Sequence, residues 1–207
     1  MPNTTWRDFP SVVGRVPKGV HGEAVVRYIT VSQDVADFHN LRCAVNGDRD
    51  GAVEPGTYAQ LWVDGTLVMS DTQMERRTNH WLLHNAWGDM LIGGLGLGMV
   101  LPPLLDDEAV TSVLVLERSL DVIALVAPHY RHPKLTVEHA DVFDWKPARD
   151  QRFNTIYLDI WPDRSVDNLP EIARLHQRFK TWKRPGGLLE SWEADHLRAL
   201  RSMRRWR

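Results

Sequence analysis

The sequence predicts an α/β fold with a mainly parallel, doubly wound sheet, and three observations predict it. Short apolar runs without polar alternation recur near residues 89–93, 112–117 and 154–159, as in strands buried on both faces of a parallel sheet. The first run leads directly into a turn with glycine at every second position. Segments with helical spacing alternate with the runs, which indicates a Rossmann-like arrangement.

The glycine turn has the pattern Gly94-x-Gly96-x-Gly98. These glycines allow positive φ and let the backbone approach a ligand closely. A dinucleotide fingerprint, G-x-G-x-x-G/A, would need a small residue at position 99, where Met99 stands instead. We expect a helix to begin near residues 99–101 and to offer its free N–H groups to a polar ligand.

Three predicted strands end in or near a carboxylate. Glu117 ends the run 112–117 and follows Gly94 by 23 residues, close to the spacing of about 20 expected for an acid that binds ribose hydroxyls. Asp141 ends a predicted strand over 137–141, and Asp159 ends the run 154–159. Open parallel sheets bind ligands at the carboxyl ends of their strands, so these acids are candidates for one site. The alternative for each is a solvated charge at a strand end.

The order of glycine turn and three acids resembles that of class I S-adenosylmethionine-dependent methyltransferases. Within that superfamily the chain is most similar to the spermidine synthase-like proteins. They carry a similar Asp-Gly hairpin before a helix and the glycine turn, here residues 58–70 with Asp64-Gly65, followed by a helix over 73–85. The resemblance implies S-adenosylmethionine as cofactor, bound by Gly94, Gly96, Gly98, Glu117, Asp141, Val142 and Asp159.

The segment Asp159-Ile-Trp-Pro-Asp163 departs from the Asp-x-x-Asp element of polyamine synthases, and their Tyr-His-Glu signature is absent. The resemblance therefore implies methyl transfer to a small-molecule acceptor. Aminopropyl transfer and non-catalytic binding of the cofactor are the alternatives. We expect Asp159 and Asp163 to be catalytic. Trp161 is either an aromatic wall of the substrate site or a packing residue.

The first 75 residues are predicted to form an N-terminal extension, and residues 76–207 the cofactor-binding domain. In the extension, residues 1–20 look irregular, and 23–31 predict a strand. A helix is expected over 33–45, with apolar residues at helical spacing: Val35, Phe38, Leu41 and Val45.

The C-terminal part predicts a helix over 168–183, ended by Pro185-Gly-Gly187, and a fifth strand over 188–192. Only 15 residues follow Trp192, so we expect the sheet to be truncated after strand five. Its edge would then be exposed, or covered by N-terminal strands or by the second copy of a homodimer.

Composition sets the outer limits. The 207 residues are 43% hydrophobic and 25% charged, with one cysteine, which excludes an intrachain disulfide. Neither a signal peptide nor a run long enough to span a membrane is evident, so we expect a cytoplasmic protein without membrane contact. We expect no metal site, since His129, His132 and His139 share no helical face.

Residues 174–207 hold ten Lys/Arg against three acids, although the whole chain has a net charge of −2. A basic C-terminal helix could bind nucleic acid through phosphates. A solvated helix end is the interpretation that we favour, because the chain as a whole is mildly acidic.

Overall fold

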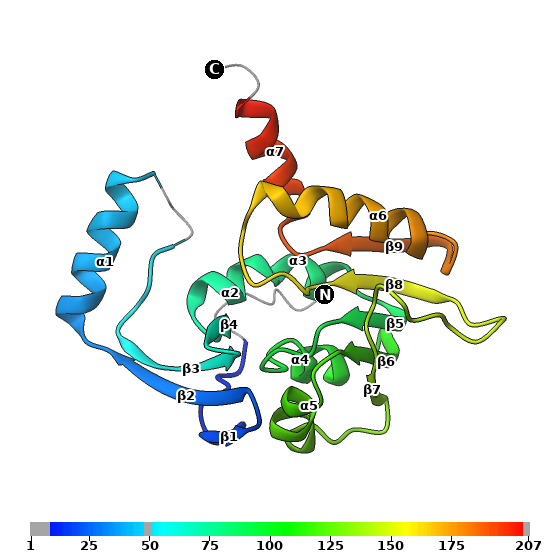
Figure 1. Ribbon diagram of the computed structural model, residues 1–207, viewed down its shortest axis with the longest axis horizontal. Coiled ribbons are helices and arrows are strands. Elements are labelled where there is room, and N and C mark those ends of the chain that lie inside the picture. The colour runs from blue at the N-terminus through cyan, green and yellow to red at the C-terminus, as the bar shows by residue number, and fades with distance from the viewer. Residues whose placement is uncertain (1–8, 48–50, 205–207) are drawn as a thin grey trace. The chain divides into compact units, whose positions relative to one another are not determined.

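The computed structural model describes residues 9–47 and 51–204 (Figure 1). The chain forms two compact units, each made from several stretches of sequence. Unit 1 comprises residues 1–84, 96–103 and 121–131, and unit 2 comprises residues 85–95, 104–120 and 132–207. The boundary expected between residues 75 and 76 falls inside helix α2 (Gln73–Thr78).

Unit 2 contains a five-stranded parallel sheet with the order β7-β6-β5-β8-β9. The chain enters this sheet at its middle strand, β5, adds β6 and β7 on one side, and then adds β8 and β9 on the other. This is the doubly wound order of Rossmann-like folds. The predicted fold class is therefore confirmed. The strands are β5 (Gly88–Gly93), β6 (Val110–Glu117), β7 (Leu135–His139), β8 (Phe153–Leu158) and β9 (Lys183–Ser191).

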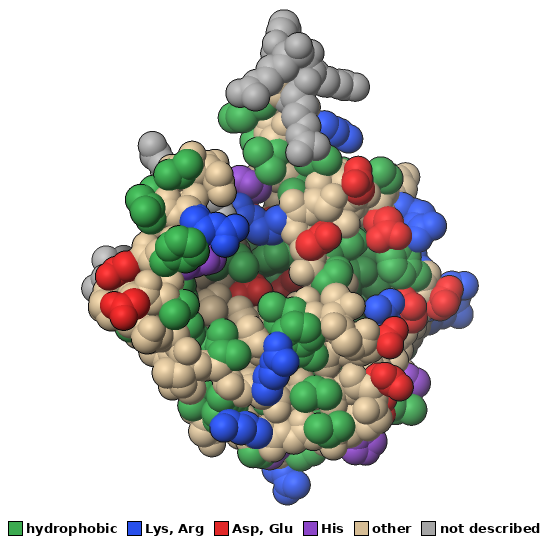
Figure 2. Space-filling model, turned by 60° about the vertical axis from the view of Figure 1, so that its left-hand side comes forward, with side chains coloured by type: hydrophobic (Ala, Val, Ile, Leu, Met, Phe, Trp, Pro, Cys, Tyr) green, Lys and Arg blue, Asp and Glu red, His purple; other side chains and the backbone are tan. Residues whose placement is uncertain are grey.

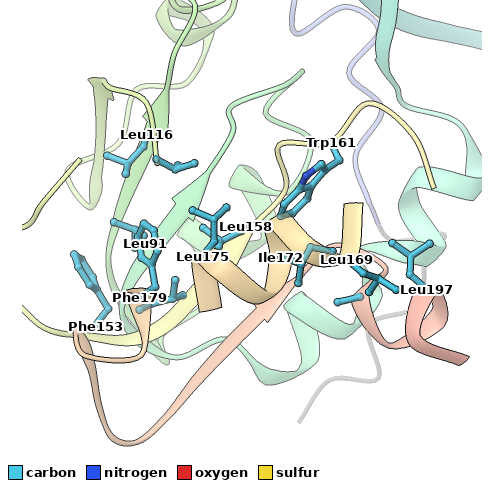
Figure 3. Packing of buried hydrophobic residues seen from close by; sticks show 13 residues of the cluster. Leu91, Leu116, Phe153, Leu158, Trp161, Leu169, Ile172, Leu175, Phe179 and Leu197 are labelled. Carbon is cyan, nitrogen blue, oxygen red and sulfur yellow. The ribbon is translucent and has the colours of Figure 1, made fainter. Parts of the chain in front are cut away.

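Helix α6 (Leu169–Phe179) connects β8 to β9 and supplies much of the core of unit 2. Its four residues at helical spacing, Leu169, Ile172, Leu175 and Phe179, are all buried, as their periodicity predicts. Figure 3 shows them packed with side chains from the parallel strands, among them Leu91 and Leu158. Helix α7 (Ala194–Arg204) adds Ala194 and Leu197 to this cluster.

The end of α6 and the start of β9 differ from the sequence prediction. The helix ends at Phe179 rather than near residue 183, and β9 begins at Lys183. Pro185-Gly-Gly187 lies inside the strand, where the pairing with β8 jumps from Phe153↔Lys183 to Thr155↔Leu188. These residues form a bulge, which accommodates a proline without N–H and a glycine at positive φ, Gly186 (+74°).

Unit 1 contains a four-stranded antiparallel sheet in sequence order. The predicted Asp-Gly hairpin joins its last two strands, with Asp64 at φ 49° and Gly65 at φ 69°. Positive φ at both central residues is typical of a type I′ turn, which matches the twist of the flanking strands. The strands are β1 (Gly19–His21), β2 (Ala24–Val31), β3 (Gly56–Val63) and β4 (Thr66–Ser70).

The predicted helix over 73–85 is interrupted at Asn79, between α2 and α3 (His80–Asn85). The fully buried Asn79 donates from its backbone N–H and its side chain to the Glu75 carbonyl, which caps α2. Helix α1 (Gln33–Val45) has the predicted bounds. The remaining helices are α4 (Leu101–Asp106), α5 (Leu120–Val126) and the 3-10 turns η2 (Ala127–His129) and η3 (Val166–Asn168).

Within the predicted irregular lead-in, residues 9–16 are anchored in unit 1 by a buried carboxylate. Asp71 is fully buried and accepts hydrogen bonds from the N–H groups of Val12 (2.8 Å) and Ala59 (2.7 Å) and from the Ser11 hydroxyl (3.1 Å). The side chains of Phe9, Val12 and Val16 are buried as well. The segment is thus part of the core, although its sequence shows no regular element.

None of the helices in the described ranges has the length and apolar character to cross a membrane. Of the basic C-terminal segment, α7 carries Arg198 and Arg201 on its surface. Arg205, Trp206 and Arg207 lie outside the described residues, as do the first residues considered for a signal peptide.

Phe179→Ala tests the packing of α6 on the sheet. Phe179 is fully buried against Trp182 at a ring centroid distance of 4.9 Å. We expect the free energy of unfolding to fall by about 3–5 kcal/mol, measured by urea denaturation. Met203→Ala, at a residue of the same unit that is 65% exposed, should change it by less than about 0.5 kcal/mol. Equal effects of the two substitutions would contradict this description of the core.

Candidate functional site

Four strands of unit 2 end side by side at one edge of the parallel sheet. Gly93, the last residue of β5, pairs with Leu116 of β6 and with Leu158 of β8. Glu117 at the end of β6 pairs with His139 of β7. Glu117 ends its strand, and Gly94, Asp141 and Asp159 follow theirs within two residues, so these residues lie at neighbouring strand ends.

The turn after β5 needs glycine because its backbone passes against β8. Gly94 has φ +96°, and a Cβ there would overlap the carbonyl oxygen of Asp159. The Gly94 N–H donates to the Leu116 carbonyl at 2.8 Å, so the turn is also fixed to β6. At Gly93 a Cβ would lie 2.9 Å from Val142. The sequence analysis overlooked Gly93, although two adjacent glycines at a strand end were a signal.

Glu117 is buried, and both of its carboxylate oxygens accept a backbone hydrogen bond. Oε2 accepts from the N–H of Leu95 at 2.9 Å, and Oε1 accepts from the N–H of Ser119 at 2.8 Å. A carboxylate oxygen has two lone pairs, so each oxygen can accept one further bond from a hydroxyl. The carboxylate is thereby fixed against the glycine turn.

Asp141 lies two residues beyond the end of β7, so the prediction that the strand extends to it is wrong. The chain turns there instead, because Asp141 Oδ1 accepts from the N–H of Phe143 at 2.8 Å and its carbonyl accepts from the N–H groups of Asp144 and Trp145. Val142 is buried next to Gly93. The turn keeps Asp141 and Val142 at the same edge of the sheet.

Asp159 directly follows β8, and its N–H donates to the Gly93 carbonyl at 2.8 Å. Among the described residues, none donates a hydrogen bond to its carboxyl group. Burial without a compensating partner raises the pKa of Asp159 to about 7. Its environment therefore differs from that of Glu117, although both are strand-end acids.

Trp161 and Asp163 lie farther along the same loop. Trp161 is 8% exposed, packs in the core cluster (Figure 3) and donates from Nε1 to Glu171 at 3.0 Å. This is the packing alternative for Trp161, and a role as a substrate wall stays a prediction. Asp163 is exposed and accepts from the Asn168 amide at 3.2 Å.

Gly96 and Gly98 belong to unit 1, with φ of +52° and +68°. A Cβ would overlap Met69 at Gly96 and the ring of Tyr130 at Gly98. Between them, the Leu97 N–H donates to Met69 Sδ at 3.2 Å, and its carbonyl accepts from the Tyr130 hydroxyl at 2.6 Å. The glycine turn is thus held on this side by the hairpin and by the segment after α5.

The sequence analysis missed polar groups at the end of β9. The Ser191 hydroxyl and His176 Nε2 lie 2.8 Å apart, and burial lowers the pKa of His176. Burial also raises the pKa of neighbouring Glu190. The rule that strand ends carry site residues, applied to strand five, would have found Glu190 and Ser191, whereas His176 lies on α6. Across the described residues, no group of three or more His, Cys, Asp or Glu is arranged to hold a metal ion.

Gly94→Ala should separate the steric from the conformational role of the turn. Gly186 also has positive φ, but a Cβ there would meet nothing within 4 Å. We expect Gly186→Ala to lower the free energy of unfolding by about 1–2 kcal/mol, the cost of left-handed backbone alone. Gly94→Ala should cost clearly more, roughly 3 kcal/mol or above, because Asp159 must also move. Equal losses in urea denaturation would show that the approach of the two strand ends is not constrained.

The pKa of Asp159 has a consequence for stability. In the unfolded chain an aspartate ionises near pH 3.9, so between about pH 4 and 7 only the unfolded state releases this proton, and stability falls as pH rises. We expect Asp159→Asn to be more stable than the unchanged protein above pH 7. The difference should shrink toward pH 4. A pH-independent difference in denaturation midpoints would contradict the raised pKa.

Neither a protein-family model nor a curated protein matches the sequence. Among solved structures, the chain is similar to spermidine synthase from Thermotoga maritima (19% identity, TM-score 0.44, covering 61% of this chain and 46% of that one). It is also similar to an N-methyltransferase from Bradyrhizobium japonicum (15% identity, TM-score 0.40, covering 55% of this chain and 61% of that one). A third similar structure is a glycopeptide N-methyltransferase complexed with S-adenosylhomocysteine (22% identity, TM-score 0.39, covering 55% of this chain and 46% of that one). The chain thus spans less than two thirds of each of these proteins.

The strand order of the parallel sheet, rather than these similarities, defines the fold. The chain has the Rossmann-like α/β fold that the resemblance to class I S-adenosylmethionine-dependent methyltransferases predicts, and at the level of the fold that resemblance is confirmed.

Proposed function

We propose that this protein is an S-adenosylmethionine-dependent methyltransferase that acts on a small molecule. The proposal rests on the residues at the carboxyl-terminal ends of the parallel strands in unit 2. Gly94 at the start of the glycine turn, Glu117, Asp141 and Asp159 lie at or just after four neighbouring strand ends there, in the order along the chain that the resemblance requires. This is the edge at which open parallel sheets bind ligands.

The residues of this edge fit the cofactor chemically, because each acid keeps an acceptor for a different part of it. Glu117 has one remaining lone pair on each oxygen, which suits the two ribose hydroxyls. Asp141 Oδ2 has no described donor and suits the adenine amino group. Asp159 has no described donor on either oxygen, so both oxygens can accept a hydrogen bond from the ligand.

When bound, the cofactor supplies a methyl group that is already activated by a sulfonium. The protein must then align an acceptor with that methyl group and exclude water. Asp159 is our candidate for proton transfer, because a carboxyl group with a pKa of about 7 can accept the proton that an amine or hydroxyl acceptor loses. Asp163, four residues later and exposed, would orient the acceptor.

Glu117→Gln tests cofactor binding. The substitution keeps the shape of the side chain but removes the charge and replaces an acceptor by a donor facing a backbone N–H. We expect the dissociation constant for S-adenosylhomocysteine, measured by calorimetry, to rise at least about tenfold. Glu108→Gln is the matched control, since Glu108 precedes the same strand at its opposite end and is exposed. No heat of binding to the unchanged protein at millimolar cofactor would overturn the proposal.

Turnover distinguishes the reaction classes. A screen of amine and hydroxyl acceptors with S-adenosylmethionine should yield S-adenosylhomocysteine. Methylthioadenosine formed from the decarboxylated cofactor and a diamine would instead identify aminopropyl transfer. Binding without either product would identify a non-catalytic cofactor-binding protein.

A further inference from the structure

Helix α1 of unit 1 exposes its apolar residues instead of burying them. Val35, Phe38, Leu41 and Val45 are 55%, 66%, 63% and 79% exposed, respectively. They recur at spacings of three and four residues and therefore share one side of the helix, here named the α1 apolar face. Figure 2 shows hydrophobic side chains on the surface of this part of the molecule.

The orientation of α1 is fixed by its opposite side. Ala36 is fully buried with Val31 and Tyr58, and Cys43 is buried as well. The Asn40 side chain forms two hydrogen bonds with the backbone of Val53, at 2.8 and 2.9 Å. Rotating the helix to bury its apolar face would break these contacts. The face is therefore a stable feature of unit 1, and an apolar stripe of this kind marks an interaction surface.

We propose that the α1 apolar face binds the same face of a second copy of this chain, with the two helices antiparallel. The charges beside the face support this arrangement. Asp34 lies at the start of the face and Arg42 toward its end, and both are exposed without an ion-pair partner among the described residues. In an antiparallel pair centred on Phe38, Asp34 lies level with Arg42 of the second copy, and Val35 level with Leu41 of the second copy. The interface is then two-fold symmetric and complementary to itself.

The alternatives fit the charges less well. In a parallel pair, Asp34 would lie beside Asp34 of the second copy, and the two like charges would repel each other. Helices that lie on membranes are rich in Lys and Arg, whereas α1 has two aspartates and one arginine. The helix has 13 residues and so is about 20 Å long. A contact of that length is at the small end of specific interfaces, and we expect a weak dimer that dissociates on dilution.

Sedimentation velocity of the full chain over a range of concentrations tests the proposal. We expect a monomer–dimer equilibrium, and Phe38→Asp should raise its dissociation constant by at least about tenfold. Val20→Asp is the matched control, because Val20 is an apolar residue of the same unit, 71% exposed on β1. Leu41→Gln should weaken the dimer in the same direction without adding a charge. Circular dichroism verifies that each variant is folded.

A charge exchange gives a sharper test. Asp34→Lys and Arg42→Glu should each weaken self-association about tenfold at low salt, because each places like charges level with one another. Mixing the two variants should restore dimers, since the mixed pair has opposite charges at both contacts. A monomer at all concentrations, an unchanged dimer in Phe38→Asp, or no gain on mixing would overturn the proposal. Phe38-dependent binding of a monomer to vesicles of phosphatidylserine and phosphatidylcholine would also overturn it.

Discussion

The candidate site depends on the close approach of two strand ends, β5 and β8. At Gly94 the backbone runs so close to the Asp159 carbonyl that no side chain fits, and the Asp159 N–H donates to the neighbouring Gly93 carbonyl. The Gly94 N–H also donates a hydrogen bond to the Leu116 carbonyl of β6. One glycine therefore brings three strand ends together. Glu117 and Asp159 take their positions from those strands, whereas Asp141 lies in the turn after β7.

Two of these carboxylates show how the environment divides chemically similar groups into different roles. Glu117 accepts from two backbone N–H groups, which fix its orientation and suit it as an acceptor of hydroxyl groups. The Asp159 carboxyl group is removed from water and accepts no hydrogen bond from the described residues. Its charged form is therefore disfavoured, and its pKa of about 7 allows it to exchange a proton near neutral pH. Two acids at the ends of β6 and β8, with only β5 between these strands, thus lie in chemically different environments.

Much of this arrangement could be predicted from sequence, because buried parallel strands, glycine turns and Asp-Gly hairpins leave local patterns. The strand end at Glu117, the end of β8 to within one residue, and the bounds of α1 follow from such patterns. The partners of Trp161 could not be predicted, since an aromatic residue after a strand can face a ligand or the core with equal local preference. That the apolar face of α1 is exposed could not be predicted either. Periodicity shows that apolar residues share a side, but not which side the rest of the fold covers.

The anchoring of residues 9–16 escaped the sequence analysis for another reason. A single carboxylate, Asp71, gathers N–H groups from positions far apart in the sequence. No local pattern encodes such a contact, because its partners are brought together only by the tertiary fold. The interruption at Asn79 is similar, since it depends on a fully buried amide rather than on a helix-breaking residue.

The bulge in β9 has a consequence for solubility. Among the described strands, β9 pairs only with β8, so its other side is a sheet edge with backbone groups that a foreign strand could bind. Pro185 removes one donor from this edge, and the bulge around Gly186 and Gly187 distorts the regular spacing that an incoming strand would need. Unwanted strand addition, the first step of cross-β aggregation, is thereby discouraged at one of the two edge strands of the described sheet.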